Sequence, residues 1–164
     1  MSEPSQQELE ALTKRYHELI SSQQTLMLST SSTSGVPDIS YAPFIRSSSG
    51  IFYIFVSDMA RHTHNLLTNP LASLLFIRPE TESQNLFARE RAILNCSSTE
   101  IPSDQATYTE HLNALQDKFG DVVGLLRSLS DFHLFAFEPQ DGRYIIGFGR
   151  AFTLNLIDDT LQPI

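Results

Sequence analysis

Cysteine is nearly absent from this chain of 164 residues, in which Cys96 is the only one. A single cysteine excludes an intrachain disulfide and a zinc site built from several cysteines. A cytoplasmic location is then the default expectation, because disulfide-bonded proteins belong mainly to oxidising compartments. Cys96 closes an apolar run, where a buried, inert thiol is more common than a reactive one. We expect a structural Cys96, and a reactive thiol remains the alternative.

Long apolar runs and lysine-rich patches are also absent. No apolar run approaches the length of a membrane span, and the polar start lacks the basic-then-apolar pattern of a signal peptide. Lysine occurs only at Lys14 and Lys118, and the net charge is −8. Nucleic-acid binding depends on neutralising phosphates, so we expect no nucleic-acid partner and no membrane partner. A small anionic ligand stays compatible with a local group of arginines.

The pattern of apolar residues predicts an α+β protein with many short antiparallel strands, folded as one domain over residues 1–164. Its expected parts are an N-terminal helix (1–22), a barrel core (24–96), a helical segment (102–130) and closing strands (131–156). Ser5 and Glu8 have the spacing of a capping box at the start of the first helix. Within these parts we expect strands at 25–31, 36–46, 51–56, 71–77, 85–95, 132–138, 143–148 and 151–156, with a turn at 139–142.

The junction between the strand at 51–56 and the strand at 71–77 is the strongest candidate site. Apolar spacing predicts a short helix at 60–67 between them, stopped by Asn69-Pro70. The start of a helix offers free backbone amides and the positive end of the helix dipole, which favour an anion. Arg61 adds a guanidinium that matches phosphate oxygens, and Ser57 adds a hydroxyl. Together these groups predict a phosphate-binding cradle.

Two alternatives stay open at this stage. In the first, Asp58 is merely the N-cap of the short helix, Arg61 is solvated, and His62 and His64 are exposed. No glycine-rich phosphate fingerprint strengthens the functional interpretation. The second concerns the charged run 89–91, which either lines a groove or subunit interface or is a solvated strand edge.

The motifs resemble those of a known family when they are taken in order along the chain. They are Ser40-Tyr41-Ala42-Pro43, Ala60-Arg61-His62, Asn69-Pro70, Leu86-Phe87-Ala88-Arg89 with Arg91, Ser130-Asp131-Phe132 and Gly147-Phe148-Gly149. This ordered set is similar to the pyridoxamine 5′-phosphate oxidase-like split barrels, in particular to their heme-utilisation (HutZ/HugZ) branch. The resemblance implies an antiparallel split β-barrel with flanking helices that forms a homodimer with paired ligand sites at the subunit interface.

The resemblance also implies a cofactor site for FMN. Arg61 and His62 would hold the phosphate, and Arg91 would reach the site, from the other subunit if the dimer places it there. The residues expected to flank the flavin are Ser40, Tyr41 and Ala42, with Ser57 nearby. No acid, base, nucleophile or metal-ligand set is recognisable in the sequence, and a flavin enzyme does not require one.

Three functions follow from this resemblance. The first is an FMN-dependent oxidoreductase, although the substrate-binding C-terminal segment of true pyridoxamine phosphate oxidases is not recognisable. The second is a heme-binding or heme-degrading protein in which Asp131 supports the chemistry; no histidine follows His133, where that branch has its iron ligand. The third is a non-catalytic flavin- or tetrapyrrole-binding module.

Overall fold

The computed structural model describes residues 4–164, and nine strands in this part of the chain form one antiparallel sheet. The strand order is β2-β1-β5-β6-β7-β4-β3, with β8 beside β7 and β9 beside β8. The strands are β1 (Thr25–Ser31), β2 (Pro37–Pro43), β3 (Ile45–Arg46), β4 (Phe52–Ser57), β5 (Leu71–Ile77), β6 (Arg91–Ile101), β7 (Phe132–Gly147), β8 (Arg150–Asn155) and β9 (Thr160–Pro163). The expected α+β architecture is confirmed.

The helices lie around this sheet, and the four α-helices are close to where the sequence predicts them. They are α1 (Gln6–Ser21), α2 (Arg61–Thr68), α3 (Ala106–Phe119), α4 (Asp121–Arg127) and the 3-10 turns η1 (Glu80–Glu82) and η2 (Leu86–Ala88). Ser5 caps α1 by accepting the Glu8 amide at 3.3 Å, as the capping box predicts. Gly120, with φ +83°, separates α3 from α4. No helix within residues 4–164 is long and apolar enough to cross a membrane.

Alternation along the strands sends one set of side chains into a continuous core. Phe44, Phe52 and Phe76 meet at its centre, with ring centroids 5.3–5.8 Å apart. Cys96 is 2 % exposed and belongs to this core, as expected. Burial raises the pKa of its thiol to about 12, which removes the reactive thiolate at neutral pH.

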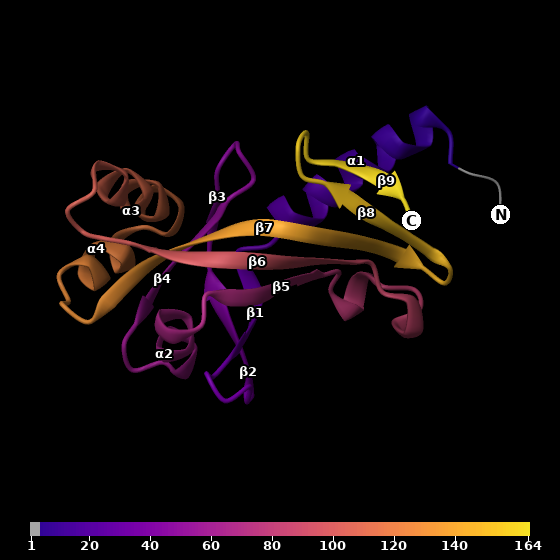
Figure 1. Cartoon of the computed structure of the whole chain (residues 1–164). Coiled ribbons are helices and arrows are strands. Elements are labelled where there is room, and N and C mark those ends of the chain that lie inside the picture. The colour runs from indigo at the N-terminus through magenta and orange to yellow at the C-terminus, as the bar shows by residue number, and fades with distance from the viewer. Residues whose placement is uncertain (1–3) are drawn as a thin grey trace.

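A second, smaller core holds α3 and α4 against the opposite face of β4 and β7. Its buried members are Tyr53, Leu112, Leu115, Val123 and Leu134. In Figure 1 the long strands β6 and β7 run through the middle of the molecule, with α3 and α4 at one end and α1, β8 and β9 towards the other. The short helix α2 lies beside β1 and β2, in the lower part of the view.

The long strand expected at 85–95 is wrong in its first half. Residues Leu86–Ala88 form η2, and the strand begins only at Arg91 and then continues to Ile101. Asn85 stabilises the turn because its Oδ1 accepts the Phe87 amide at 3.0 Å. The apolar pair Leu86 and Phe87 imitates a strand in sequence, yet both side chains are exposed.

Two other boundaries also differ from expectation. The turn expected at 139–142 is absent, because β7 runs unbroken from Phe132 to Gly147. Asn95 pairs with Asp141 and Cys96 with Pro139, so Gln140 is the extra residue of a β-bulge. The single strand expected at 36–46 is interrupted after Pro43 and becomes β2 and β3.

Candidate functional site

The junction between β4 and α2 has the form that an anion site requires. Helix α2 begins at Arg61, and its N-cap is Ala60, which supplies no side-chain cap. The first amides of a helix have no acceptor within the helix, so the start of α2 carries donors that its own cap leaves unused. The alternative that Asp58 caps this helix is wrong, because its Oδ1 lies 2.5 Å from Nε2 of His133.

Arg61 occupies the first position of α2 and is largely solvated. Its side chain is 77 % exposed, and its Nη1 lies 3.7 Å from Oδ1 of Asp38 on β2. Such a long, exposed ion pair contributes little to stability, so the guanidinium is free to turn towards a ligand. Arg61 therefore has the position that the sequence predicts, with an acidic neighbour that the sequence did not predict.

His62, the next residue, is buried rather than solvated. It is 8 % exposed, and its Nε2 has no hydrogen-bond partner within residues 4–164. Burial lowers the pKa of His62, and the nearby Asp38 carboxylate opposes this shift only in part. The ring is thus neutral at pH 7 and keeps one nitrogen available. An unpaired buried polar atom is unusual in proteins and points to a missing partner.

Ser57 and Asp131 are joined by a hydrogen bond, although the resemblance assigns them to different cofactors. The Ser57 hydroxyl donates to Oδ2 of Asp131 at 2.9 Å and accepts the Met59 amide at 3.2 Å. The Asp58 amide donates to the carbonyl of Asp131 at 2.7 Å. These bonds attach the β4–α2 turn to the start of β7. Ser57 is therefore part of the site's framework.

The three residues expected from β2 differ in face and in burial. Ala42 is 1 % exposed and lies in the core, so its side chain does not flank a ligand. Tyr41 is 67 % exposed on the opposite face of the strand. Ser40 is partly buried on the same face as Asp38, towards α2. Alternation along the strand puts Ser40 and Ala42 on the face of Asp38 and Tyr41 on the other, and of the first two only Ser40 is not buried in the core.

Arg91 is distant from the other predicted residues within one chain. It pairs with Ile77 of β5, whereas Leu71, which follows α2, pairs with Ser97 six positions further along β6. At ~3.3 Å per residue this separation is roughly 20 Å. Its Nη1 donates to the Arg89 carbonyl at 2.9 Å. One copy of the chain does not bring Arg91 to the α2 site.

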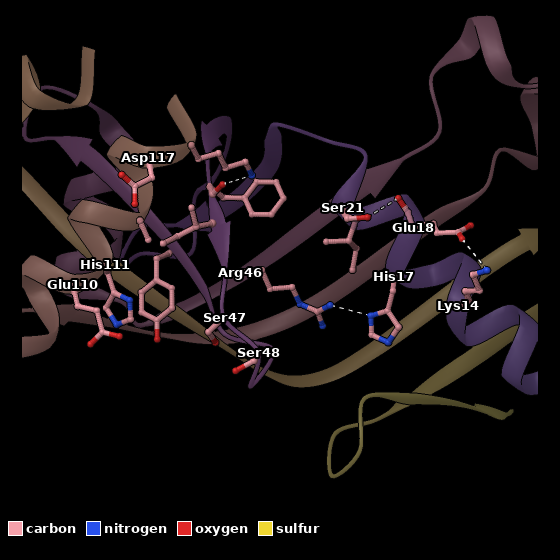
Figure 2. A pocket seen from close by; sticks show the side chains of 16 residues that line it. Lys14, His17, Glu18, Ser21, Arg46, Ser47, Ser48, Glu110, His111 and Asp117 are labelled. Carbon is pink, nitrogen blue, oxygen red and sulfur yellow. Dashed lines mark hydrogen bonds and ion pairs between the residues drawn. The ribbon is translucent and has the colours of Figure 1, made fainter. Parts of the chain in front are cut away.

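A hollow of about 1070 Å³ lies elsewhere, between α1, the β3–β4 hairpin and α3 (Figure 2). At one end Arg46 donates to Nδ1 of His17 at 3.1 Å and to Asp159 at 2.7 Å. At the other end the His111 ring stacks on Tyr53 at 3.8 Å. The sequence did not reveal this hollow, because its residues come from distant segments and share no motif.

Comparison with known proteins decides the family. Residues 12–146 match the sequence model described as pyridoxamine 5′-phosphate oxidase. The chain belongs to this family. It is 34 % identical over 132 residues to the heme oxygenase HutZ of Vibrio cholerae, covering 80 % of this chain and 74 % of HutZ. The match to the pyridoxamine 5′-phosphate oxidase family confirms the predicted resemblance.

Solved structures agree with membership of the pyridoxamine 5′-phosphate oxidase family. HutZ of Vibrio cholerae, described as a heme storage protein, superposes with a TM-score of 0.77 at 32 % identity over 87 % of this chain and 99 % of its own. Campylobacter jejuni ChuZ gives 0.80 at 23 %, covering 94 % and 63 %. An FMN-binding protein of Nostoc punctiforme gives 0.64 at 14 %, covering 94 % and 95 %. The last two support the fold alone, and the expected split barrel is confirmed.

Proposed function

We propose that this member of the pyridoxamine 5′-phosphate oxidase family binds FMN at the start of α2 and is an FMN-dependent oxidoreductase. One observation carries the proposal: an uncapped helix start bears an exposed arginine and a buried histidine whose Nε2 has no partner within residues 4–164. A phosphate supplies what these groups lack, namely acceptor oxygens and negative charge.

The residues present fit the phosphate of FMN. The His62 ring and the first amides of α2 would approach it as hydrogen-bond donors, with the ring in the tautomer that carries hydrogen on Nε2. Arg61 would exchange its loose contact with Asp38 for a charge-assisted pair. Ser57 and Asp131 would keep the turn in place through their 2.9 Å hydrogen bond. When bound, FMN supplies the electron-transfer chemistry, and these residues hold it.

A homodimer is part of the proposal, because one face of the sheet carries a row of apolar side chains that the single chain leaves exposed or only partly buried. Tyr41, Met27, Leu75 and Ile93 form a row across β2, β1, β5 and β6 on the face opposite the core. Tyr41 is 67 % exposed in the single chain, which is costly for a large aromatic ring. A second copy packed on this face would bury the row. Arg91 lies on the same face and would approach the partner's site.

Heme is the second candidate cofactor, because HutZ, 34 % identical to this chain, is a heme oxygenase. The propionates of heme are anions that suit the same helix start. The engagement of His133 argues against ranking heme first. Both ring nitrogens of His133 are taken by carboxylates at 2.5 Å, so this residue is not free to ligate iron. FMN needs no iron ligand.

The test is a titration of the purified protein with FMN and, separately, with hemin. Bound FMN gives a band near ~450 nm, and bound heme gives a Soret band near ~400 nm. We expect Arg61→Ala to weaken FMN binding roughly 5- to 150-fold, which is ~1–3 kcal/mol for one charge-assisted pair.

Arg127→Ala is the matched control for this titration. It removes the same charge from α4, where the guanidinium donates to Asn113 and Gln116 at 2.9 and 2.8 Å. Equal FMN affinity in the Arg61 variant, the Arg127 variant and the parent protein would refute the phosphate assignment. A Soret band together with no response to FMN would replace FMN with heme.

A further inference from the structure

His133 has an environment that neither the resemblance nor the proposed function uses. It lies on β7 opposite Val56 of β4. Its Nε2 is 2.5 Å from Oδ1 of Asp58 in the β4–α2 turn, and its Nδ1 is 2.5 Å from Oε1 of Glu100 on β6. The ring therefore joins three segments that are far apart in the sequence.

Both contacts require a hydrogen on the ring nitrogen. An ionised carboxylate only accepts hydrogen bonds, and a neutral imidazole carries a single N–H. Either neutral tautomer therefore donates to one carboxylate and turns the lone pair of its other nitrogen towards the second carboxylate, which is repulsive. The imidazolium alone satisfies both. The arrangement is thus complete only while His133 is doubly protonated.

The charges facing the ring favour that state. Asp58 faces it from the turn and Glu100 faces it from β6, while Val56 of β4 and Phe135 on its own strand carry no charge. Burial lowers the pKa of His133, but the hydrogen bonds to Glu100 and Asp58 outweigh this and raise it above its usual value near 6.5. The ring is partly exposed, at 22 %, so water protons reach it.

The β4–α2 turn needs such an anchor. Ala60 provides no cap for α2, so the start of the helix is placed by the turn that precedes it. That turn is bound to the beginning of β7 by the Asp58 amide and the Ser57 hydroxyl, both of which donate to Asp131. The Asp58 carboxylate adds a third attachment through His133.

We propose that His133 is a positioning residue whose imidazolium, held between Asp58 and Glu100, fixes the start of α2, so that loss of its proton loosens the anion site. This inference rests on the proposed function, because it takes the start of α2 to be the ligand site. The sign follows from the contacts. Ligand affinity is expected to be highest at mildly acidic pH, where His133 is protonated, and to fall as the pH rises through the raised pKa of the ring.

The experiment measures FMN affinity of the full chain from pH 6 to pH 9, for the parent protein and for His133→Gln. Between pH 6 and pH 9 we expect the FMN affinity of the parent to fall about tenfold more than that of the variant, because the parent loses one charge-assisted hydrogen bond. The variant shares every titration of FMN itself, so the difference between the two profiles reports the ring. Asp58→Asn, which keeps the size of the side chain, is expected to flatten the profile in the same way.

His111→Gln serves as the control, because this ring stacks on Tyr53 away from the β4–α2 turn. It is expected to keep the parent's pH profile. Parallel profiles for the parent and His133→Gln would overturn the proposal, since a purely structural histidine shifts affinity equally at every pH.

A second readout separates this proposal from that of the FMN site. Hydrogen exchange of the Asp58 amide, which donates to the Asp131 carbonyl at 2.7 Å, reports the attachment of the turn without any ligand. We expect its protection factor to drop at alkaline pH in the parent and to be low at every pH in His133→Gln. If FMN does not bind but the protection factor still drops, the proposed function fails and the role of His133 in holding the β4–α2 turn is supported. A protection factor that does not change with pH in the parent refutes that role.

Discussion

Glu90→Gln is the substitution whose effect on stability follows most directly from the structure. The Glu90 side chain is 5 % exposed and is held by two arginines. Arg15 of α1 donates to it through Nε and Nη2 at 3.0 and 2.9 Å, and Arg78 does the same from the end of β5. The Tyr144 hydroxyl of β7 donates as well. One carboxylate therefore joins α1, β5 and β7.

The magnitude follows from burial. Removing one partner of a buried ion pair costs about 3–5 kcal/mol. Arg15 is half exposed and regains water when its partner is lost, which places the cost near the lower end. We expect a loss of ~3 kcal/mol in the free energy of unfolding and, for a chain of this size, a melting temperature lower by roughly 6–12 °C.

Urea unfolding at pH 7, followed by circular dichroism, measures the change. Glu80→Gln is the matched control, because Glu80 is 71 % exposed and lies 3.4 Å from Arg89. Its loss is expected to stay within about 0.5 kcal/mol, as for other surface pairs. If the free energies of unfolding of Glu90→Gln and Glu80→Gln differ by less than about 1 kcal/mol, the upper value for a surface ion pair, the buried cluster does not stabilise the fold as proposed.

The same cluster contributes to the response to acid. Burial of Glu90 raises its pKa, but the hydrogen bonds from Arg15, Tyr144 and Arg78 outweigh burial and lower the pKa below its usual value. A carboxyl whose folded pKa is lowered stabilises the protein above its unfolded pKa, and this contribution disappears as the pH falls through the folded pKa. Glu90→Gln is therefore expected to lose less stability than the parent between pH 5 and pH 3, a range estimated as roughly that of carboxyl titration.

Two further predictions concern the core. Gly142→Ala places a Cβ 2.7 Å from Cδ2 of Leu94 and 2.9 Å from Cβ of Leu154, and should lower the urea midpoint by an amount equivalent to ~1–3 kcal/mol. Gly124→Ala, whose Cβ meets only the flexible end of Gln116, is its control and should be neutral or stabilising. Cys96 should react with a thiol reagent such as DTNB roughly a hundredfold more slowly in the native protein than in urea, because its thiol is buried with a pKa near 12. Rapid native labelling would contradict the packing of β6.

Local patterns in the sequence determined much of the fold. The capping box at Ser5, the strand–helix–strand order from β4 to β5 and the glycine between α3 and α4 were all predictable. These features depend on residues within a few positions of one another, where hydrogen bonding and apolar spacing act directly. The family was predictable for a related reason, since its motifs keep their order along the chain.

Contacts between distant segments decided the rest. The sequence of residues 85–90 predicts a strand. In the structure Glu90 forms ion pairs with Arg15 and Arg78, and the strand begins only after it. The environments of Ser40, Tyr41 and Ala42 depended on the face of β2 and on how deeply the core covers that face at each position, which the packing of the whole fold sets. The environment of His133 requires the turn before α2 and the end of β6 to meet at β7. No local pattern encodes such a meeting, because the pairing of strands far apart in sequence is what creates it.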